Sequence, residues 1–223
     1  MNHYVEVRAK VPNADFHYMG HSNGTYLCAR ALLDYPATAF SRIMFAGSVV
    51  HQSFPWRELM KWKRVSKVYN GVATGDWVVA LFPNGLRYLK GVFDLGGAGH
   101  TGFNVENQNR LLNFDYVEGD HSASRVESQW AAISSFIVNE QFPKMGSNHP
   151  SYKCSQPLWI KFLGFFSPVF ILIIAIAVLG IGLKLAIVFF TSFFVNQENM
   201  GPGIYLLGML IYLLVIRFLA LKY

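Results

Sequence analysis

The sequence has 223 residues, of which 52% are hydrophobic and 14% are charged, and its formal net charge is +6. This length allows one domain with an appendage or two small domains, and the apolar content excludes a disordered chain and suggests a membrane segment. The basic residues are spread along the chain or flank apolar segments instead of forming one dense stripe, so we expect no nucleic-acid partner.

Residues 1–142 alternate short apolar runs with longer segments of helical periodicity. In chain order, these patterns predict a helical segment at 1–11, a strand at 15–19, a helix near 24–35, a strand at 42–50, a helix near 56–64, strands at 67–73 and 113–117, and a helix near 124–138. The alternation predicts an α/β domain in which a mostly parallel sheet of about four strands is flanked by helices.

The remainder of the chain has the pattern of a linker and a membrane anchor. Residues 143–157 are rich in Pro, Gly and polar residues, which is typical of a linker, and 158–223 form the expected transmembrane region. Residues 162–183 contain no charged side chain, and a helix needs about 20 residues to cross a hydrocarbon core. After a polar turn at 196–203, residues 204–221 form a second, weaker span, so we expect a transmembrane helical hairpin.

The basic residues predict the orientation of this hairpin. Lys153 and Lys161 precede the first span, and Arg217 and Lys222 close the second. By the positive-inside rule, we expect an integral membrane protein whose amino-terminal domain and carboxyl-terminal tail are both cytoplasmic.

Lys184 leaves two lengths open for the first span. If the helix ends near residue 183, Lys184 lies at the far interface, where its side chain can reach the head groups. If the helix continues to residue 195, Lys184 comes nearer the middle of the membrane, where an unpaired charge costs several kcal/mol. Because of this cost we prefer the shorter span.

A Gly-x-Ser-x-Gly motif occupies residues 20–24, between the strand at 15–19 and the following helix. A strand, a sharp turn and a helix around such a motif form a nucleophile elbow, which holds its serine, here Ser22, in solvent above the sheet. Serine is also a common first residue of a helix, so Ser22 has a second interpretation as a helix cap.

A serine nucleophile needs a base to take its proton and an acid to orient that base. Asp76 follows the strand at 67–73 and His121 follows the strand at 113–117, so the three residues occur in the order Ser, Asp, His, each near a strand end. Asp76 has an alternative interpretation as a turn residue. His100, in the glycine-rich segment 96–102, is an alternative base or a pocket residue.

Segments 18–26, 42–50, 73–79 and 117–121, which hold these residues, resemble the α/β-hydrolase superfamily, and the resemblance covers residues 3–140. It implies a membrane-anchored serine hydrolase of esterase or lipase type, which cleaves an ester or related acyl bond of a small-molecule or lipid substrate without a cofactor. The backbone amide of Asn23 would then donate to the oxyanion. Because the family's base follows the last strand, we prefer His121 to His100.

The family has eight strands with the elbow after the fifth, so the sequence is similar to the carboxyl-terminal half of that domain. We therefore expect the elbow strand to be an exposed edge of the sheet. The expected protein partner is either a missing amino-terminal half or a second copy of the chain in self-association. The helical segment at 1–11 is the expected cover for this edge, with Tyr4, Val5 and Val11 facing inward. The alternative function is a catalytically impaired or truncated hydrolase-like membrane adaptor.

Two further features have open interpretations. Residues 56–67 combine two tryptophans with five basic residues, which is typical either of an interfacial lid on anionic head groups or of a solvated basic helix. His21 is a second candidate pocket residue, although His17, His21 and His51 also suit packing or surface positions. Neither these histidines nor Cys28 and Cys154 have metal-ligand spacing, so we expect no metal.

Overall fold

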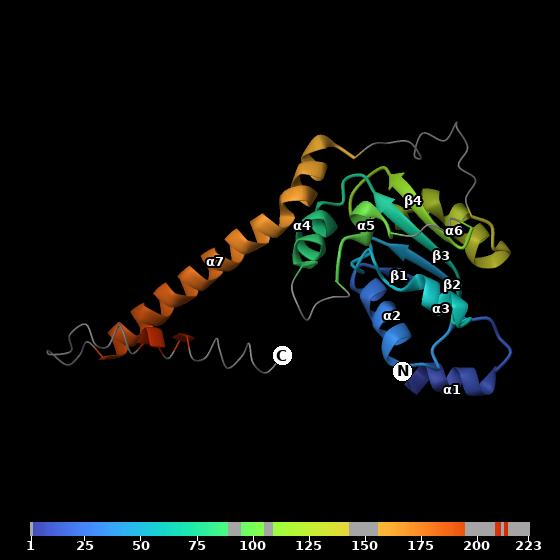
Figure 1. The fold of residues 1–223 in the computed structure, drawn as a ribbon, viewed down its shortest axis with the longest axis horizontal. Coiled ribbons are helices and arrows are strands. Elements are labelled where there is room, and N and C mark those ends of the chain that lie inside the picture. Colours follow the sequence, from blue (N-terminus) through green and yellow to red (C-terminus); the bar gives the residue numbers. More distant parts are fainter. Residues whose placement is uncertain are drawn as a thin grey trace. The chain divides into compact units, whose positions relative to one another are not determined.

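The computed structural model describes residues 2–88, 95–104, 109–142, 156–194, 208–210 and 212–213. Contacts divide the chain into two units, Met1–Val169 and Phe170–Tyr223. The first unit contains a four-stranded parallel sheet of β1 (His17–His21), β2 (Phe40–Ala46), β3 (Val65–Ala73) and β4 (Leu111–Val117), in the order β1-β2-β3-β4 (Figure 1). The predicted α/β class and parallel sheet are confirmed.

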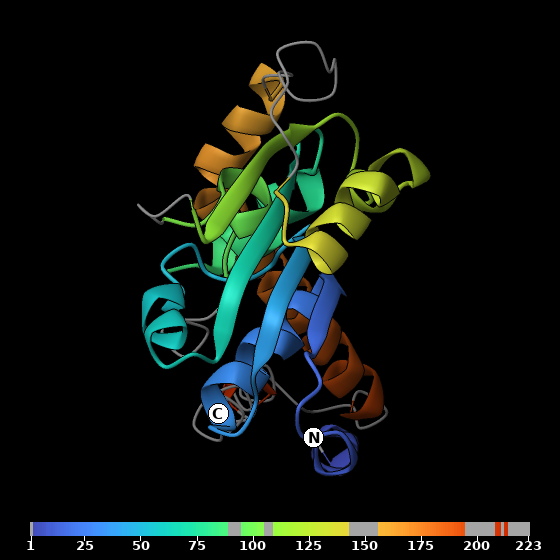
Figure 2. The same ribbon diagram turned by 90° about the vertical axis from the view of Figure 1, so that its right-hand side faces the viewer.

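Helices cover both faces of this sheet. In chain order they are α1 (Asn2–Lys10), α2 (Asn23–Asp34), α3 (Trp56–Lys61), α4 (Trp77–Leu86), α5 (Ala98–Thr101), the short 3₁₀ helix η1 (Ala123–Arg125) and α6 (Glu127–Asn139). One core contains side chains of α2, α3 and α5, and the other contains side chains of η1 and α6. Figure 2 shows α6 on the near side of the sheet.

The strands alternate between these two cores, as a strand with both faces covered must. In β2, Ile43 and Phe45 pack in the core with α2, whereas Met44 and Ala46 pack in the core with α6. β2 ends at Ala46, earlier than predicted. The next residue, Gly47, has a φ of +54°, which lies outside the negative range that strand residues adopt.

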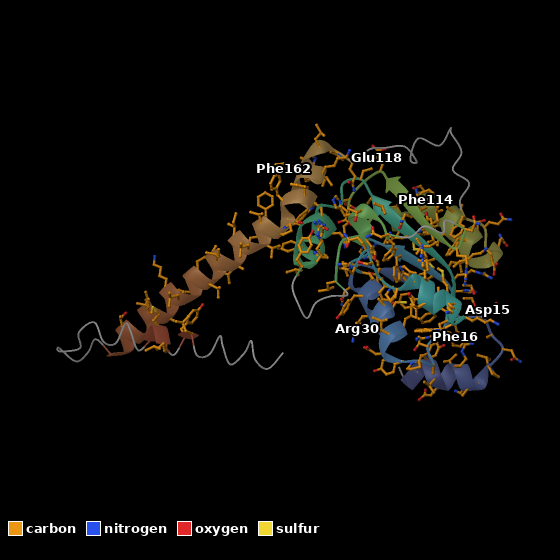
Figure 3. The ribbon with its side chains drawn as sticks, in the orientation of Figure 1. Asp15, Phe16, Arg30, Phe114, Glu118 and Phe162 are labelled. Carbon is orange, nitrogen blue, oxygen red and sulfur yellow. The ribbon has the colours of Figure 1, made fainter. Side chains whose placement is uncertain are left out.

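β1 lies at an end of the described sheet, so one of its edges has no strand beside it among the described residues. Met19 on this strand is 57% exposed. α1 packs against the start of β1 through Tyr4, whose ring meets that of Phe16 edge-on with the ring centroids 5.4 Å apart. Figure 3 labels Phe16 at this end of the sheet. Val5 and Val11 are exposed, so of the three residues predicted to face inward only Tyr4 makes this packing.

A single long helix, α7 (Leu158–Phe194), begins in the first unit and continues into the second. Its residues Leu158–Phe189 are long and apolar enough to cross a membrane, judged by length and composition alone. The helix continues past Lys184 to Phe194, so it is longer than the predicted 162–183. The second predicted span, 204–221, lies almost entirely outside the described residues, as does 143–155 of the predicted linker, and the hairpin is not shown.

The first turns of α7 belong to the α/β unit, which therefore extends beyond the predicted boundary at residue 142. Ile160, Gly164 and Ser167 are buried, and their spacing places them on one helix face. Pro168 has no N–H, so the carbonyl of Gly164, four residues earlier, loses its usual helical partner. The Asn84 side-chain amide of α4 donates to this carbonyl at 2.7 Å, and the Ser167 hydroxyl donates to it at 2.8 Å.

Candidate active site

Ser22 has a backbone conformation that side chains rarely adopt. Its φ is +52° and its ψ is −124°, between the last residue of β1 and the first residue of α2. Conformations of this kind cost roughly 1–3 kcal/mol and occur mainly where the surrounding structure imposes them, often at functional sites. The Ser22 side chain makes no capping hydrogen bond to α2, although the residue occupies the cap position. The structure therefore gives no support to the interpretation of Ser22 as a side-chain cap.

The backbone around Ser22 is fixed on both sides of the turn. Ser22 N–H donates to the Ala46 carbonyl at 3.0 Å, and the Ser22 carbonyl accepts from the Thr25 hydroxyl at 2.7 Å. A Cβ at Gly20 would lie 2.7 Å from the Tyr18 ring, so this glycine is required by close packing. At Gly24 a Cβ would come no closer than 3.6 Å to its nearest neighbour, so space alone does not require glycine there.

Asp76 and His121 form a hydrogen-bonded pair across the ends of β3 and β4. His121 Nδ1 lies 2.8 Å from Asp76 Oδ2, and the Asp76 side chain is fully buried whereas that of His121 is 18% exposed. The other oxygen, Oδ1, accepts from Val79 N–H at 3.0 Å and caps α4. The Asp76 carboxylate therefore makes both a contact with His121 and a cap at the start of α4.

The two loops that carry this pair are held together by their backbones. Gly75 N–H donates to the Gly119 carbonyl at 2.7 Å, and Thr74 N–H donates to the Val117 carbonyl at 2.9 Å. Because the carboxylate can only accept, the His121 proton lies on Nδ1, which leaves Nε2 free to accept a proton. This is the tautomer that a general base for a serine requires.

The His121 ring lies against the backbone that follows β2. A Cβ at Gly47 would be 2.6 Å from His121 Cε1, so only glycine leaves room for the ring. In the register of β1 and β2, His21 is opposite Ala46, which brings Ser22 beside Gly47. Among the described residues no hydrogen bond joins Ser22 Oγ to His121 Nε2. Catalytic contacts of this type are often long without substrate and shorten when it binds.

His21 supports His121 directly. Its Nε2 lies 3.0 Å from the His121 carbonyl and therefore donates to it, and the two rings are 4.6 Å apart. Burial lowers the pKa of His21, which keeps the ring neutral near pH 7. Sequence reasoning placed His21 in a pocket or in the packing but did not identify this contact, because it joins residues on two separate loops.

A small cavity is lined by residues of β1, β2, η1 and α6, including the two residues that precede Ser22. Its volume is about 160 Å³. The residues around it include Gly20, His21, Met44, Arg125, Trp130 and Ile133.

His100 and Asn23 occupy the remaining predicted positions. His100 is buried in α5, where its hydrogen bonds go to Gln156, and among the described residues no hydrogen bond joins it to Asp76 or Ser22. Burial lowers the pKa of His100. Asn23 is the first residue of α2. Its N–H is one of the backbone donors in the first turn of a helix that have no intrahelical acceptor. This N–H is therefore suited to an oxyanion.

Within the segment 56–67, the two tryptophans have different environments. Trp56 is 1% exposed and packs on Phe54 with ring centroids 4.6 Å apart, whereas Trp62 is 62% exposed. Only Trp62 and its basic neighbours therefore remain available for an interfacial role. Among the described residues, no group of three or more His, Cys, Asp or Glu side chains could hold a metal ion.

Comparison with known proteins gives no match for this chain, whether against protein families, curated proteins or solved structures.

Proposed function

We propose that this protein is a membrane-anchored serine hydrolase of esterase or lipase type, with the partial sheet of an α/β hydrolase. The observation that carries the proposal is the strained backbone of Ser22 next to the hydrogen-bonded pair Asp76–His121. A strained serine between a strand and a helix matches a nucleophile elbow, and the acid and base follow later strands in the order expected for this family.

The chemistry follows the arrangement of the three residues. Ser22 Oγ attacks the acyl carbonyl carbon while His121 Nε2 takes the serine proton, and the carbonyl oxygen becomes an oxyanion near Asn23 N–H. His121 then gives this proton to the leaving alkoxide as the acyl–oxygen bond breaks. A water molecule, deprotonated by the same nitrogen, releases the acid from the acyl-enzyme. Asp76 orients His121 and stabilises its charged form.

The substrate class follows from the membrane anchor and the site. Residues 170–189 of α7, which follow the α/β unit, extend about 30 Å at a rise of 1.5 Å per residue, which is the thickness of a hydrocarbon core. Lys184 then lies five residues before the end of this stretch, where its long side chain can reach the far interface. We infer that the substrate is a lipid ester or a small acyl ester that reaches the site from the membrane surface.

Labelling with a fluorophosphonate, which phosphonylates activated serines with loss of fluoride, tests the proposal. The full-length chain in detergent should be labelled, and Ser22→Ala should abolish the label. Ser53→Ala, at an exposed serine, is the matched control and should be labelled like the unmodified chain. Labelling that persists in Ser22→Ala would remove Ser22 as the nucleophile.

A second candidate is a catalytically impaired, hydrolase-like membrane adaptor. The open edge of β1 favours it, because an unpaired strand edge can receive a strand from a partner. An unlabelled but folded chain, with a single cooperative melt, would support this candidate over the enzyme.

The proposed orientation, with the α/β unit and the chain's end both cytoplasmic, has its own test. In sealed vesicles whose cytoplasmic face is outside, protease should digest the α/β unit and also remove a tag placed after Tyr223. A protected tag together with a digested unit would mean that the chain crosses the membrane once.

A further inference from the structure

A second cavity lies within the first unit, between α4, α5 and the first turns of α7, and the proposed reaction does not use it. Its volume is about 350 Å³. The described residues that line it include Arg87, His100, Gln156, Lys161, Gly164 and Phe165. This size is sufficient for a small polar group with part of a chain attached.

His100 directs a hydrogen-bond donor toward this space. The side chain is only 4% exposed, and its Nδ1 accepts from the Gln156 amide at 3.1 Å, while the same amide nitrogen donates to the His100 carbonyl at 2.7 Å. With Nδ1 as acceptor, the neutral ring carries its proton on Nε2. Nε2 faces Gly164, where a Cβ would clash with it, and no acceptor for this N–H is found among the described residues.

Two cationic side chains line the same cavity. Arg87 donates from Nη1 to Asn84 Oδ1 at 2.6 Å, while its Nε is buried without a partner among the described groups. Lys161, in the first turn of α7, also lines the cavity, and its flexible side chain can bring an ammonium to it. None of the described residues that line the cavity carries a carboxylate, so these charges have no counter-ion there.

A guanidinium, an ammonium and an imidazole N–H around one cavity suit an anion with several oxygens. Phosphate fits this set best, because its oxygens can accept from several directions and a guanidinium fork matches two of them at once. A carboxylate has only two oxygens in one plane, so it offers these groups fewer directions of approach than a phosphate does.

The position of the cavity indicates where such a phosphate comes from. Phe165, 74% exposed, lies one helical turn after Lys161, and the apolar part of α7 follows it. A basic residue followed by an aromatic residue at the start of a membrane helix is typical of the head-group level of a bilayer. We propose that this cavity binds the phosphate head group of an anionic lipid, with the acyl chains along Phe165 and the apolar helix. The lipid source rests on the proposed membrane span, whereas the phosphate chemistry does not.

The test measures binding to the full-length chain in an uncharged detergent. The probes are phosphatidic acid, phosphatidylcholine and inorganic phosphate, each titrated while native mass spectrometry and the melting temperature report binding. The cavity variant is Arg87→Gln with Lys161→Gln. The matched control is Lys10→Gln with Lys61→Gln, which removes the same charge at exposed positions outside the cavity.

We expect each chain to bind one phosphatidic acid, at least tenfold more tightly than phosphatidylcholine. The cavity variant should bind phosphatidic acid at least tenfold more weakly than the control does. Inorganic phosphate that binds as tightly as phosphatidic acid would support the phosphate site but refute the lipid source. Equal losses in the cavity variant and the control would mean non-specific charge attraction and would overturn the proposal, as would the absence of binding.

Folding of the variants is checked by their melts without ligand. Arg87→Lys keeps the charge but loses the guanidinium fork, so it should bind phosphatidic acid more weakly than the control and more tightly than the cavity variant. If Arg87→Lys binds as tightly as the control, the guanidinium fork does not hold the phosphate and the proposed site is refuted. Fluorophosphonate labelling of Ser22 should not change in the cavity variant, so this site and the proposed activity can fail separately.

Discussion

Replacing Asp76 by Asn separates the two roles of this side chain. Oδ1 caps α4 through Val79 N–H, and Oδ2 accepts from His121 Nδ1. An asparagine oxygen can keep the cap, but its NH₂ group then faces His121. Two donors cannot bond to each other, so the His121 proton is expected to move to Nε2, where it prevents the nitrogen from accepting the proton of Ser22.

The structure predicts a large loss of reactivity with a small loss of stability. Asparagine is as good a helix cap as aspartate, and about 1 kcal/mol corresponds to roughly 2–4 °C in the melting temperature of a domain of this size. The wrong tautomer in a serine triad costs about 10⁴-fold in rate, which is about 5.5 kcal/mol at 1.36 kcal/mol per factor of ten. We therefore expect fluorophosphonate labelling to slow by about 10³- to 10⁴-fold while the melting temperature falls by only a few degrees.

The assay is the rate of labelling at pH 7.5, with the melt of each variant recorded by circular dichroism in the same detergent. Asp34→Asn is the matched control, because Asp34 pairs with Arg30 at 2.7 Å on the exposed surface of α2. If Asp76→Asn is labelled as fast as this control, the Asp76–His121 pair does not activate Ser22, and the triad is refuted even if Ser22 itself reacts.

Two further predictions concern the residues around this pair. Gly47→Ala should slow labelling at least 100-fold, because its Cβ would displace the His121 ring. Gly180→Ala is the control and should be labelled normally, because a Cβ at Gly180 would have no neighbour within 4 Å. Equal labelling rates of the two variants would show that the position of the His121 ring does not matter. Burial lowers the pKa of several histidines, so the unfolded chain binds more protons near pH 6.5 and the folded state should lose stability as the pH falls from 7.5 to 5.5. These histidines are His17, His21, His51 and His100. A melting temperature that rises or stays constant over this range would contradict the assignment.

The sheet was predictable because its signals are local. Each strand is a short apolar run bounded by turn residues, and the carboxyl ends of neighbouring parallel strands meet at one edge, which is why Asp76 and His121 could be placed together from strand positions alone. α4 was not predicted, because Pro83 and Gly85 fall within it and its apolar residues follow one another without a helical period. Tertiary packing overrides these helix-breaking residues, since Pro83, Asn84 and Gly85 are all buried.

Contacts between distant segments could not be predicted in this way. His21 and His121 are a hundred residues apart, and neither local pattern indicates that one ring packs on the other. Asn84 has the appearance of a turn residue in the sequence, and its role depends on the carbonyl that Pro168 leaves free. The predicted domain boundary at residue 142 left out the first turns of α7 for the same reason, because only three buried residues mark their packed face within an otherwise apolar helix.

That boundary leads to the last prediction, which compares a fragment ending at residue 150 with one ending at Val169. The shorter fragment lacks Ile160, which is fully buried and whose burial is worth about 1.5–3 kcal/mol. It also removes two acceptors of the Asn84 amide, the Gly164 carbonyl and the Ser167 hydroxyl, and leaves it the Ala80 carbonyl; at about 0.5–1.5 kcal/mol each, the two lost hydrogen bonds are worth about 1–3 kcal/mol.

The sum, about 2.5–6 kcal/mol, is a large part of the 5–15 kcal/mol that stabilises a typical domain. Residues 1–169 should therefore melt cooperatively in detergent, whereas residues 1–150 should be partly unfolded or self-associated at the same temperature. The open edge of β1 is common to both fragments, so it cannot explain a difference between them. Sedimentation of 1–150 as a monomer with the same melting temperature as 1–169 would show that α7 adds nothing to the fold. A difference of the expected size would instead mean that the first turns of the long apolar helix are a structural part of the α/β unit.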